Sequence, residues 1–342
     1  MFPALLDKLH RRQDLTVAEA AGAMDEIMEG RAQPAQIAGF LVALAMKGER
    51  PAEIVGLART MRARCTKLSR SFEPLFDTCG TGGDKAHTFN VSTIAALVLA
   101  ACGVRVAKHG NRSVSSRCGS ADLFESMGVN ITASPEIVER CLEETGIAFF
   151  FAPTFHPSMR HAAPTRRDLG IRTAFNLLGP LTNPAGASRQ LVGVPRPELT
   201  ELVARSLAML GAERAWVVHG ADGLDEISTT GYTKVSECRD GAVNTFYVHP
   251  SDFMLPKAQP QALKGGDVSE NAQIARRILA GERGAPRDIV LLNAGVSMLI
   301  AGVESTVTEG IARAAAAIDE GRAAAVLEKL AQMSHAPTGA EA

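Results

Sequence analysis

A short glycine-rich segment between two apolar stretches is the strongest constraint on this chain. Residues 77–93 read Asp-Thr-Cys-Gly-Thr-Gly-Gly-Asp-Lys-Ala-His-Thr-Phe-Asn-Val-Ser-Thr. The apolar pair 75–76 predicts the end of a strand, and the run 93–100 predicts a buried helix. Glycine gives the backbone access to positive φ and lets a ligand approach closely. Such a strand–turn–helix offers free N–H groups and a helix dipole, which together suit a phosphate.

Two common phosphate-binding motifs do not fit this segment. A GxGxxG motif from Gly80 needs glycine at position 85, where the sequence has lysine. A Walker A motif also needs glycine there, followed by Lys-Ser or Lys-Thr, and the chain has Ala86-His87. Taken alone, the segment is interpreted equally well as an ordinary βα turn that contains glycines.

The next polar segment favours phosphate binding. Residues 104–107 predict a strand, and residues 108–116 read Lys-His-Gly-Asn-Arg-Ser-Val-Ser-Ser. The strand–turn–helix–strand unit spans about thirty residues, the size of a βαβ crossover. Both polar loops then leave the carboxyl ends of parallel strands, where open α/β sheets bind ligands. Two cations, one imidazole, one amide and three hydroxyls suit a phosphorylated sugar.

Composition excludes several classes of protein. The 342 residues include 36 Lys and Arg against 37 Asp and Glu, so the net charge of −1 predicts no general attraction to nucleic acid or membrane. The apolar runs are shorter than the roughly 20 residues that span a bilayer, and the first residues lack an export-signal pattern. The six cysteines contain no CxxC pair, which predicts reduced thiols and a cytoplasmic location. The eight histidines form no HExxH motif, which argues against catalytic zinc.

The order of predicted elements indicates an α/β fold with a small N-terminal α-helical domain and a larger α/β domain around a mostly parallel sheet. Helices are predicted after a capping box at 16–19, after Pro34 and after Pro51. Strands and helices alternate from about residue 72. The predicted strands are 75–78, 104–107, 191–194 and 215–219, with a hairpin over 234–248. One closing helix is predicted over 308–333.

Several longer blocks resemble the signatures of the anthranilate phosphoribosyltransferase family, which shares its fold with nucleoside phosphorylases. The first blocks are Gly-Thr-Gly-Gly-Asp at 80–84, Thr-Phe-Asn-Val-Ser-Thr at 88–93 and Lys-His-Gly-Asn-Arg-Ser at 108–113. The resemblance continues through 166–173, 176–184, 225–226 and 265–267, and so covers nearly the whole chain. The blocks at 108–113 and 176–184 are the most specific.

The resemblance implies a pentosyltransferase of tryptophan biosynthesis. Its family moves the phosphoribosyl group of phosphoribosyl pyrophosphate to the amine of anthranilate, giving N-(5-phosphoribosyl)anthranilate and pyrophosphate. It also implies a helical domain of residues 1–70, joined by helices from about 160–190, and an α/β domain of residues 71–342. The substrates would lie between the two domains, and the helical domain would form a homodimer.

A magnesium site is implied by two adjacent acids. Asp225 and Glu226 lie on a loop after the predicted strand 215–219. Adjacent acids usually belong to a solvated surface, but here they match the family's metal-binding acids. With Ser92, they are expected to bind two Mg²⁺ ions per subunit, and Mg²⁺ commonly bridges phosphate oxygens.

The resemblance also assigns residues to the two substrates. Phosphoribosyl pyrophosphate is expected at Gly80, Gly82, Gly83, Asp84, Thr88, Asn90, Val91, Ser92, Thr93, Lys108, His109, Gly110, Asn111, Arg112, Ser113, Val114, Ser115, Ser116 and Ser120. Anthranilate is expected at Gly80, His109, Asn111, His156, Arg166, Gly179 and Pro180. No catalytic base is indicated. Lys85 and His87 depart from the family pattern, and contact with pyrophosphate and projection into solvent are equally good interpretations.

Two other functions deserve comparison. A pyrimidine nucleoside phosphorylase shares the fold, but a Lys-His-Ser-Thr-Gly-Gly-Val-Gly-Asp-Lys block would be expected and the chain lacks it. A nucleic-acid-binding relative should be more basic and should lack the acids at 225–226. The transferase is therefore the preferred prediction, with no nucleic acid or membrane partner.

Overall fold

The computed structural model describes residues 1–84, 86–113 and 117–337 of the chain. In this part, one sheet of seven strands has the order β3-β2-β1-β4-β5-β6-β7. Strands β1 to β5 are parallel, and β6 and β7 add an antiparallel hairpin. The strands are β1 (Phe76–Gly80), β2 (Val106–Gly110), β3 (Ile147–Phe151), β4 (Arg189–Gly193), β5 (Arg214–Gly220), β6 (Thr233–Arg239) and β7 (Ala242–Val248). The predicted fold class, a helical part followed by a mostly parallel α/β part, is confirmed.

The sequence prediction found six of these strands and missed β3. Its residues Ile-Ala-Phe-Phe-Phe are all buried, so the strand has no alternation of polar and apolar side chains. A short apolar run of this kind cannot be told from a buried helix by periodicity. Its place at the edge of the parallel part, paired with β2, is a tertiary property.

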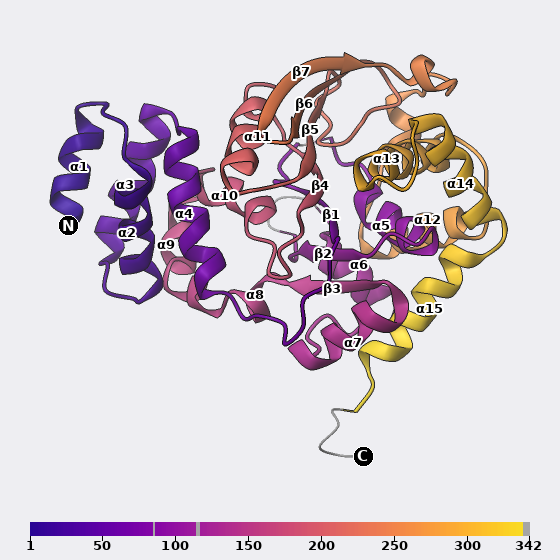
Figure 1. The fold of residues 1–342 in the computed structure, drawn as a ribbon, viewed down its shortest axis with the longest axis horizontal. Helices are drawn as coiled ribbons and strands as arrows, with labels where there is room; N and C mark the ends of the chain where they lie inside the picture. The colour runs from indigo at the N-terminus through magenta and orange to yellow at the C-terminus, as the bar shows by residue number, and fades with distance from the viewer. Residues whose placement is uncertain (85, 114–116, 338–342) are drawn as a thin grey trace.

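The N-terminal helices stand together at one end of the molecule (Figure 1). They are α1 (Phe2–His10), α2 (Val17–Met28), α3 (Pro34–Lys47) and α4 (Pro51–Arg64). The predicted capping box is present: Glu19 N–H donates to Thr16 Oγ1 at 3.2 Å, and Thr16 N–H donates to Glu19 Oε2 at 2.8 Å. Gly56 lets α4 approach α2 closely, because a Cβ there would lie 2.4 Å from the Val17 carbonyl oxygen.

A segment from the middle of the chain joins these helices to the sheet. It contains η1 (Pro157–His161), α9 (Ala163–Leu169), α10 (Phe175–Leu178) and η2 (Gly179–Leu181). Phe175 and Leu178 belong to one apolar core that also includes Leu44 of α3 and Val192 and Val217 of the sheet. Helix α11 (Leu199–Met209) contributes to the same core. The helical part therefore packs against the sheet through continuous apolar contact.

Other helices cover the opposite side of the sheet (Figure 1). They are α5 (Val91–Ala101), α6 (Ser120–Ser126), α7 (Pro135–Thr145), α12 (Val268–Leu279), α13 (Ala285–Ala301), α14 (Val307–Asp319) and α15 (Arg322–Ser334), with α8 (Ala152–Phe155), η3 (Pro250–Phe253) and η4 (Pro260–Leu263) in connections. The prediction of one closing helix over 308–333 is wrong. Gly321, at φ +73°, ends the first helix and starts the second, so the alanine-rich run folds back as two helices.

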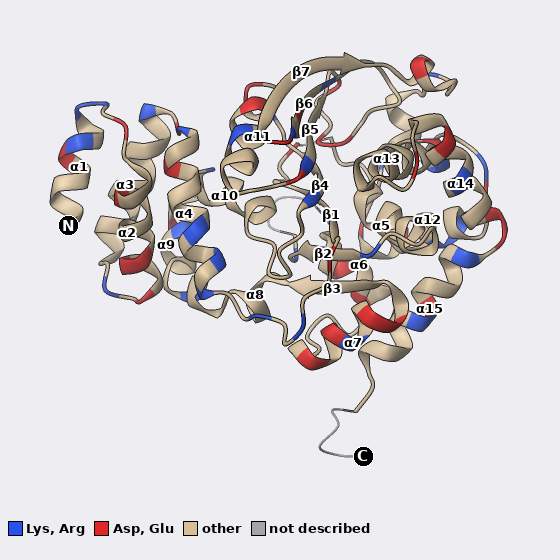
Figure 2. Cartoon of the chain, in the orientation of Figure 1, with Lys and Arg blue, Asp and Glu red and all other residues tan. Residues whose placement is uncertain are grey.

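Charges are spread over both parts of the molecule (Figure 2). All six cysteines are buried and form no disulfide. Among the described residues, no helix has the length and apolar character needed to cross a membrane.

Candidate active site

Many of the predicted site residues lie at the carboxyl ends of the parallel strands and in the loops that follow them. Strand β1 lies between β2 and β4, and β5 is the next strand along. Because these strands are parallel, the loops after β1, β2 and β5 leave from the same edge. The last residues of β1 and β2 and the loops after β1, β2 and β5 carry the glycine segment 80–84, the segment 108–113 and the acids Asp225 and Glu226. The topology therefore collects segments that are far apart in the sequence.

Two glycines create the space for the first acid. A Cβ on Gly80 would lie 2.7 Å from Asp225 Oδ2, and a Cβ on Gly193 would lie 1.6 Å from the Asp225 carbonyl oxygen. Any side chain at these positions would push the acid out of place. The loop after β5 can therefore adopt this position only because β1 and β4 both end in glycine.

Both acids are partly buried and their pKa values are raised. Burial, and then the Asp84 carboxylate, raises the pKa of Asp225 to about 7. Burial, and then the Asp225 carboxylate, raises the pKa of Glu226 to about 8. Glu226 Oε1 accepts a hydrogen bond of 3.1 Å from the Ser92 N–H, which brings together all three residues predicted to bind metal. Adjacent carboxylates that are partly buried are stabilised by a bound cation.

The donor set fits magnesium that is shared with a substrate. Within the described residues, no three His, Cys, Asp or Glu side chains are arranged to hold a metal by themselves. Mg²⁺ commonly takes one or two protein carboxylates and completes its shell with water and phosphate oxygens. Asp225, Glu226 and the Ser92 hydroxyl would therefore suffice beside a phosphorylated substrate.

Lys108 is a buried cation next to these acids. It is 2% exposed, its Nζ donates to the Thr78 carbonyl, and its charge favours the ionised form of Glu226. Asp77 is fully buried below it and accepts from the Asn183 amide at 2.8 Å and from the His109 N–H at 3.2 Å. Sequence reasoning did not assign a role to Asp77 or Asn183. The only sign of such a role in the sequence is that both are polar residues next to apolar ones.

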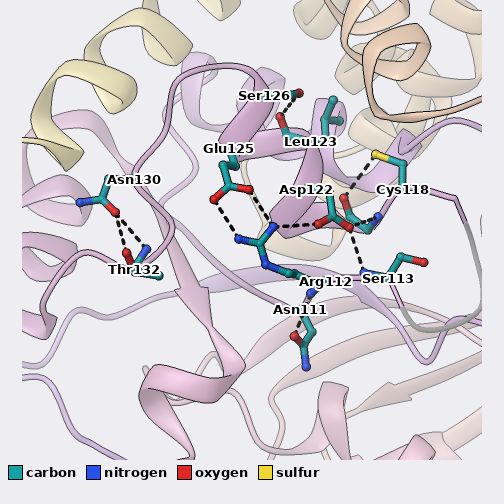
Figure 3. A network of polar contacts seen from close by, with 11 residues as sticks. Asn111, Arg112, Ser113, Cys118, Asp122, Leu123, Glu125, Ser126, Asn130 and Thr132 are labelled. Carbon is teal, nitrogen blue, oxygen red and sulfur yellow. Dashed lines mark hydrogen bonds and ion pairs between the residues drawn. The ribbon is translucent and has the colours of Figure 1, made fainter.

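The segment after β2 is held by its own hydrogen bonds (Figure 3). Arg112 forms ion pairs with Asp122 at 3.0 Å and with Glu125 at 2.7 Å, and these carboxylates raise the pKa of the guanidinium. The Ser113 N–H donates to Asp122 Oδ2 at 3.0 Å. Asn111 is exposed and accepts from the Arg112 N–H through its side chain. The charge of Arg112 is thus already compensated by two carboxylates. Its contact with phosphate stays a prediction.

Gly110 and Ser120 lie against each other at the start of α6. A Cβ on Gly110 would lie 2.2 Å from Ser120 Oγ, so only glycine fits there. The predicted residues Val114, Ser115 and Ser116 lie outside the described residues, as does Lys85.

The N-terminal end of α5 presents the other predicted phosphate contacts. Thr88 and Asn90 precede the helix, and Val91 and Thr93 are buried in its first turn. Thr93 Oγ1 is a buried hydroxyl with no hydrogen-bond partner among the described residues. The Asn90 amide is engaged on both sides: it donates to the Cys118 carbonyl at 3.0 Å and accepts from Asn271 at 3.1 Å.

Two buried histidines stand side by side. The rings of His109 and His156 are 5.2 Å apart, and each ring bonds a carbonyl at 3.0 Å, Gly179 and Thr182 respectively. Burial lowers the pKa of His109 to about 3 and that of His156 to about 4, so both are neutral at pH 7. The second nitrogen of each ring, His109 Nε2 and His156 Nδ1, is buried without a partner among the described residues. Each can therefore accept a hydrogen bond from a ligand.

Arg166 is a half-buried cation that lacks a carboxylate partner among the described residues. Its guanidinium lies 5.1 Å from the Phe175 ring centroid, and burial lowers its pKa. The turn Gly179-Pro180 follows the helix that carries Phe175, and the Gly179 carbonyl is hydrogen-bonded to the His109 ring. An arginine in this environment is suited to a carboxylate ligand.

Two residues that hold these loops in place, Arg172 and Asn293, were given no such role by the sequence prediction. Arg172 Nη1 donates to the Gly82 carbonyl at 2.6 Å, and a Cβ on Gly83 would lie 1.8 Å from the same nitrogen. Asn293 of α13 is fully buried and binds both the N–H and the carbonyl of Ile227, each at 3.0 Å. It thereby fixes the residue next to Glu226. The one sign of this role in the sequence is that Asn293 is a polar residue within an apolar helix.

Comparison with known proteins places this site in a family. Residues 3–65 match a family model described as the helical bundle domain of a glycosyl transferase family, and residues 73–324 match its α/β domain. These matches define a glycosyl transferase. The anthranilate phosphoribosyltransferase of Moorella thermoacetica is 54% identical over 330 residues, which is 96% of this chain and 97% of that protein. The chain therefore belongs to the anthranilate phosphoribosyltransferases.

Solved structures agree with this placement. The anthranilate phosphoribosyltransferase of Thermus thermophilus superposes with a TM-score of 0.91 at 45% identity, covering 97% of this chain and 99% of that one. The Saccharomyces cerevisiae enzyme in complex with PRPP and Mg superposes with a TM-score of 0.89 at 27% identity, covering 97% of both chains. The yeast enzyme has also been solved with 4-fluoroanthranilate, with a TM-score of 0.86 at 26% identity over 98% of both chains.

Proposed function

We infer that this protein transfers the phosphoribosyl group of phosphoribosyl pyrophosphate to the amine of anthranilate, releasing pyrophosphate. The observation that carries the inference is full-length similarity to enzymes of this name at about half of all positions. The site provides the matching chemistry: a glycine loop, a partly buried pair of acids, and an arginine with no carboxylate partner among the described residues. The product is a precursor in tryptophan biosynthesis.

We propose that the loops after β1 and β2 bind phosphoribosyl pyrophosphate. The glycines at 80, 82 and 83 carry no side chain, so a ligand can approach the backbone of this loop closely, and the hydroxyls and amide at 88–93 lie on the segment that follows. Lys108 and the segment 109–120 would bind the ribose and its phosphate. The residues proposed are those predicted from the sequence.

We propose that Asp225, Glu226 and Ser92 hold magnesium, with two ions per subunit. Magnesium supplies charge neutralisation for the pyrophosphate leaving group. The raised pKa values of both acids support this assignment, because a nearby cation would remove the cost of ionising them.

We propose that anthranilate binds between Arg166 and the two histidines. Arg166 would bind the carboxylate in a bidentate pair. The free ring nitrogens of His109 and His156 are acceptors suited to the amine hydrogens, and Asn111, Gly80, Gly179 and Pro180 would complete the surroundings. An aromatic amine is uncharged at neutral pH, so the reaction depends mainly on positioning and charge stabilisation at the anomeric carbon.

The domain division, assembly and location are also proposals. We divide the chain into a helical domain of residues 1–70, joined by helices from about 160–190, and an α/β domain of residues 71–342. We propose a homodimer formed by the helical domain, which analytical ultracentrifugation would test. Six buried cysteines that form no disulfide support a reducing, cytoplasmic environment.

The activity is tested by following the loss of anthranilate fluorescence with phosphoribosyl pyrophosphate and Mg²⁺. We expect turnover that depends on both substrates and stops when EDTA is added. Thymidine with inorganic phosphate serves as the control for a nucleoside phosphorylase. Turnover of thymidine without turnover of anthranilate would contradict the proposed function.

A further inference from the structure

A basic pocket lies beside the proposed phosphoribosyl pyrophosphate site. It has a volume of about 220 Å³ and is lined by His87, Thr88, Arg117, Lys264, Gly266 and Asn271, with Cys118 and Gly265 completing the wall. Three of these side chains are basic and none is acidic. Thr88 belongs to the predicted substrate set, whereas Arg117, Lys264 and Asn271 do not.

The two long cations of this pocket are free to meet a ligand. Arg117 and Lys264 are exposed, and neither side chain forms a hydrogen bond or ion pair with another described residue. By contrast, Arg112 in the preceding segment is bound by two carboxylates. Acidic residues lie near the pocket but outside its lining. In the capping box that starts α12, the Glu270 carboxylate accepts from the Asp267 N–H, and Asp267 accepts from the Glu270 N–H.

Backbone pairing builds the wall of the pocket. Thr88 and Lys264 form an isolated antiparallel bridge, and the Gly265 N–H donates to the His87 carbonyl at 2.9 Å. A Cβ on Gly265 would lie 2.7 Å from the Phe89 nitrogen, so glycine is required for this close approach. The segment before α12 is thereby attached to the segment that follows the glycine loop.

A buried amide relay connects this wall to both phosphate loops. Asn271 is 2% exposed and accepts from the Gly266 N–H at 2.8 Å. Its amide donates to Asn90 at 3.1 Å, and Asn90 donates to the Cys118 carbonyl at 3.0 Å. The relay fixes Lys264, Thr88 and Arg117 on segments that are held relative to one another before any ligand binds, which reduces the entropy lost on binding.

We propose that this basic pocket binds a phosphate group of phosphoribosyl pyrophosphate, and that Lys264 and Arg117 are substrate-binding residues. This inference rests on the proposed function. The ligand class follows from the lining: two exposed cations, a histidine and the Thr88 hydroxyl, with no acid in the lining, match a phosphate. Both the 5-phosphate and the pyrophosphate of this substrate offer the same phosphate chemistry. The experiment below therefore determines which of the two groups the pocket binds.

The test compares Lys264→Ala, Arg117→Ala and the double variant with the wild-type protein. Lys257→Ala is the control, because Lys257 is an exposed lysine in the same connection and outside the pocket. Steady-state kinetics gives the KM for each substrate, and calorimetry gives the Kd for phosphoribosyl pyrophosphate, ribose 5-phosphate and magnesium pyrophosphate. Thermal unfolding verifies that all variants are folded.

We expect each single variant to raise the KM for phosphoribosyl pyrophosphate about three- to tenfold and the double variant more, since each contact is charge-assisted but partly exposed. The KM for anthranilate should change little. Weaker binding of ribose 5-phosphate would assign the pocket to the 5-phosphate, and weaker binding of pyrophosphate to the leaving group.

A double variant with the wild-type KM for phosphoribosyl pyrophosphate would overturn the inference, even if it bound free pyrophosphate less well. This comparison can be made only if the wild-type protein turns over both substrates. A wild-type protein without turnover would instead refute the proposed function, so the two failures are distinguishable.

Discussion

Replacing Glu226 by glutamine should stabilise the metal-free protein and abolish most of its turnover. In the folded chain, burial and the Asp225 carboxylate raise the pKa of Glu226 from 4.5 to about 8. In the unfolded chain the carboxyl ionises at its ordinary pKa. Between these values the folded state holds a proton that the unfolded state has lost, so the free energy of unfolding falls as pH rises.

The expected magnitude follows from this window. Each pH unit within it lowers the free energy of unfolding by about 1.4 kcal/mol for one group. From pH 4.5 to about 8 the loss approaches an upper limit of about 4–5 kcal/mol. Glutamine resembles the protonated carboxyl in shape and never ionises, so Glu226→Gln avoids the loss. The variant and the wild type should therefore unfold alike below pH 4.5 and differ most near pH 8.

Urea unfolding in EDTA at pH 4.5, 6 and 8 measures this difference. The control is Glu328→Gln, an exposed position on α15 that should behave as wild type at each pH. Turnover with Mg²⁺ is measured on the same samples. A Glu226→Gln protein that is no more stable than wild type at pH 8 would refute the argument from burial. Retained magnesium-dependent turnover would refute the metal-binding role.

Two further predictions concern the substrate contacts. Arg166→Ala should raise the KM for anthranilate about ten- to a hundredfold through loss of a charge-assisted contact, with little change for phosphoribosyl pyrophosphate, and Arg166→Lys should recover only part. Kinetics with each substrate varied in turn tests this, and an equal effect on both substrates would argue for a structural role. Gly83→Val should weaken phosphoribosyl pyrophosphate binding at least about tenfold, because residue 83 has φ +82° and its Cβ would overlap Arg172. Calorimetry measures that affinity, and wild-type binding by Gly83→Val would exclude the glycine loop as a phosphate site.

Local signals in the sequence predicted most of the framework. The capping box at Thr16 and the prolines at 34 and 51 marked helix starts, because such caps depend only on residues a few positions apart. The alternation of strands and helices indicated the parallel sheet, and the glycine loop pointed to phosphate. The missed strand β3 and the unexpected break at Gly321 share one cause. An apolar or alanine-rich run looks uniform in sequence, and its conformation is decided by what it packs against.

The sequence alone predicted which segments bind a phosphorylated sugar and determined which family's blocks they resemble, since those signals lie within short stretches of chain. Only the tertiary structure decided what these stretches touch. It brought Asp225 into the space left by Gly80 and Gly193, and it set Lys264 beside Thr88 in a basic pocket. Such contacts join residues far apart in the sequence. Their geometry depends on strand order and on the close approach of backbones, which no local pattern encodes.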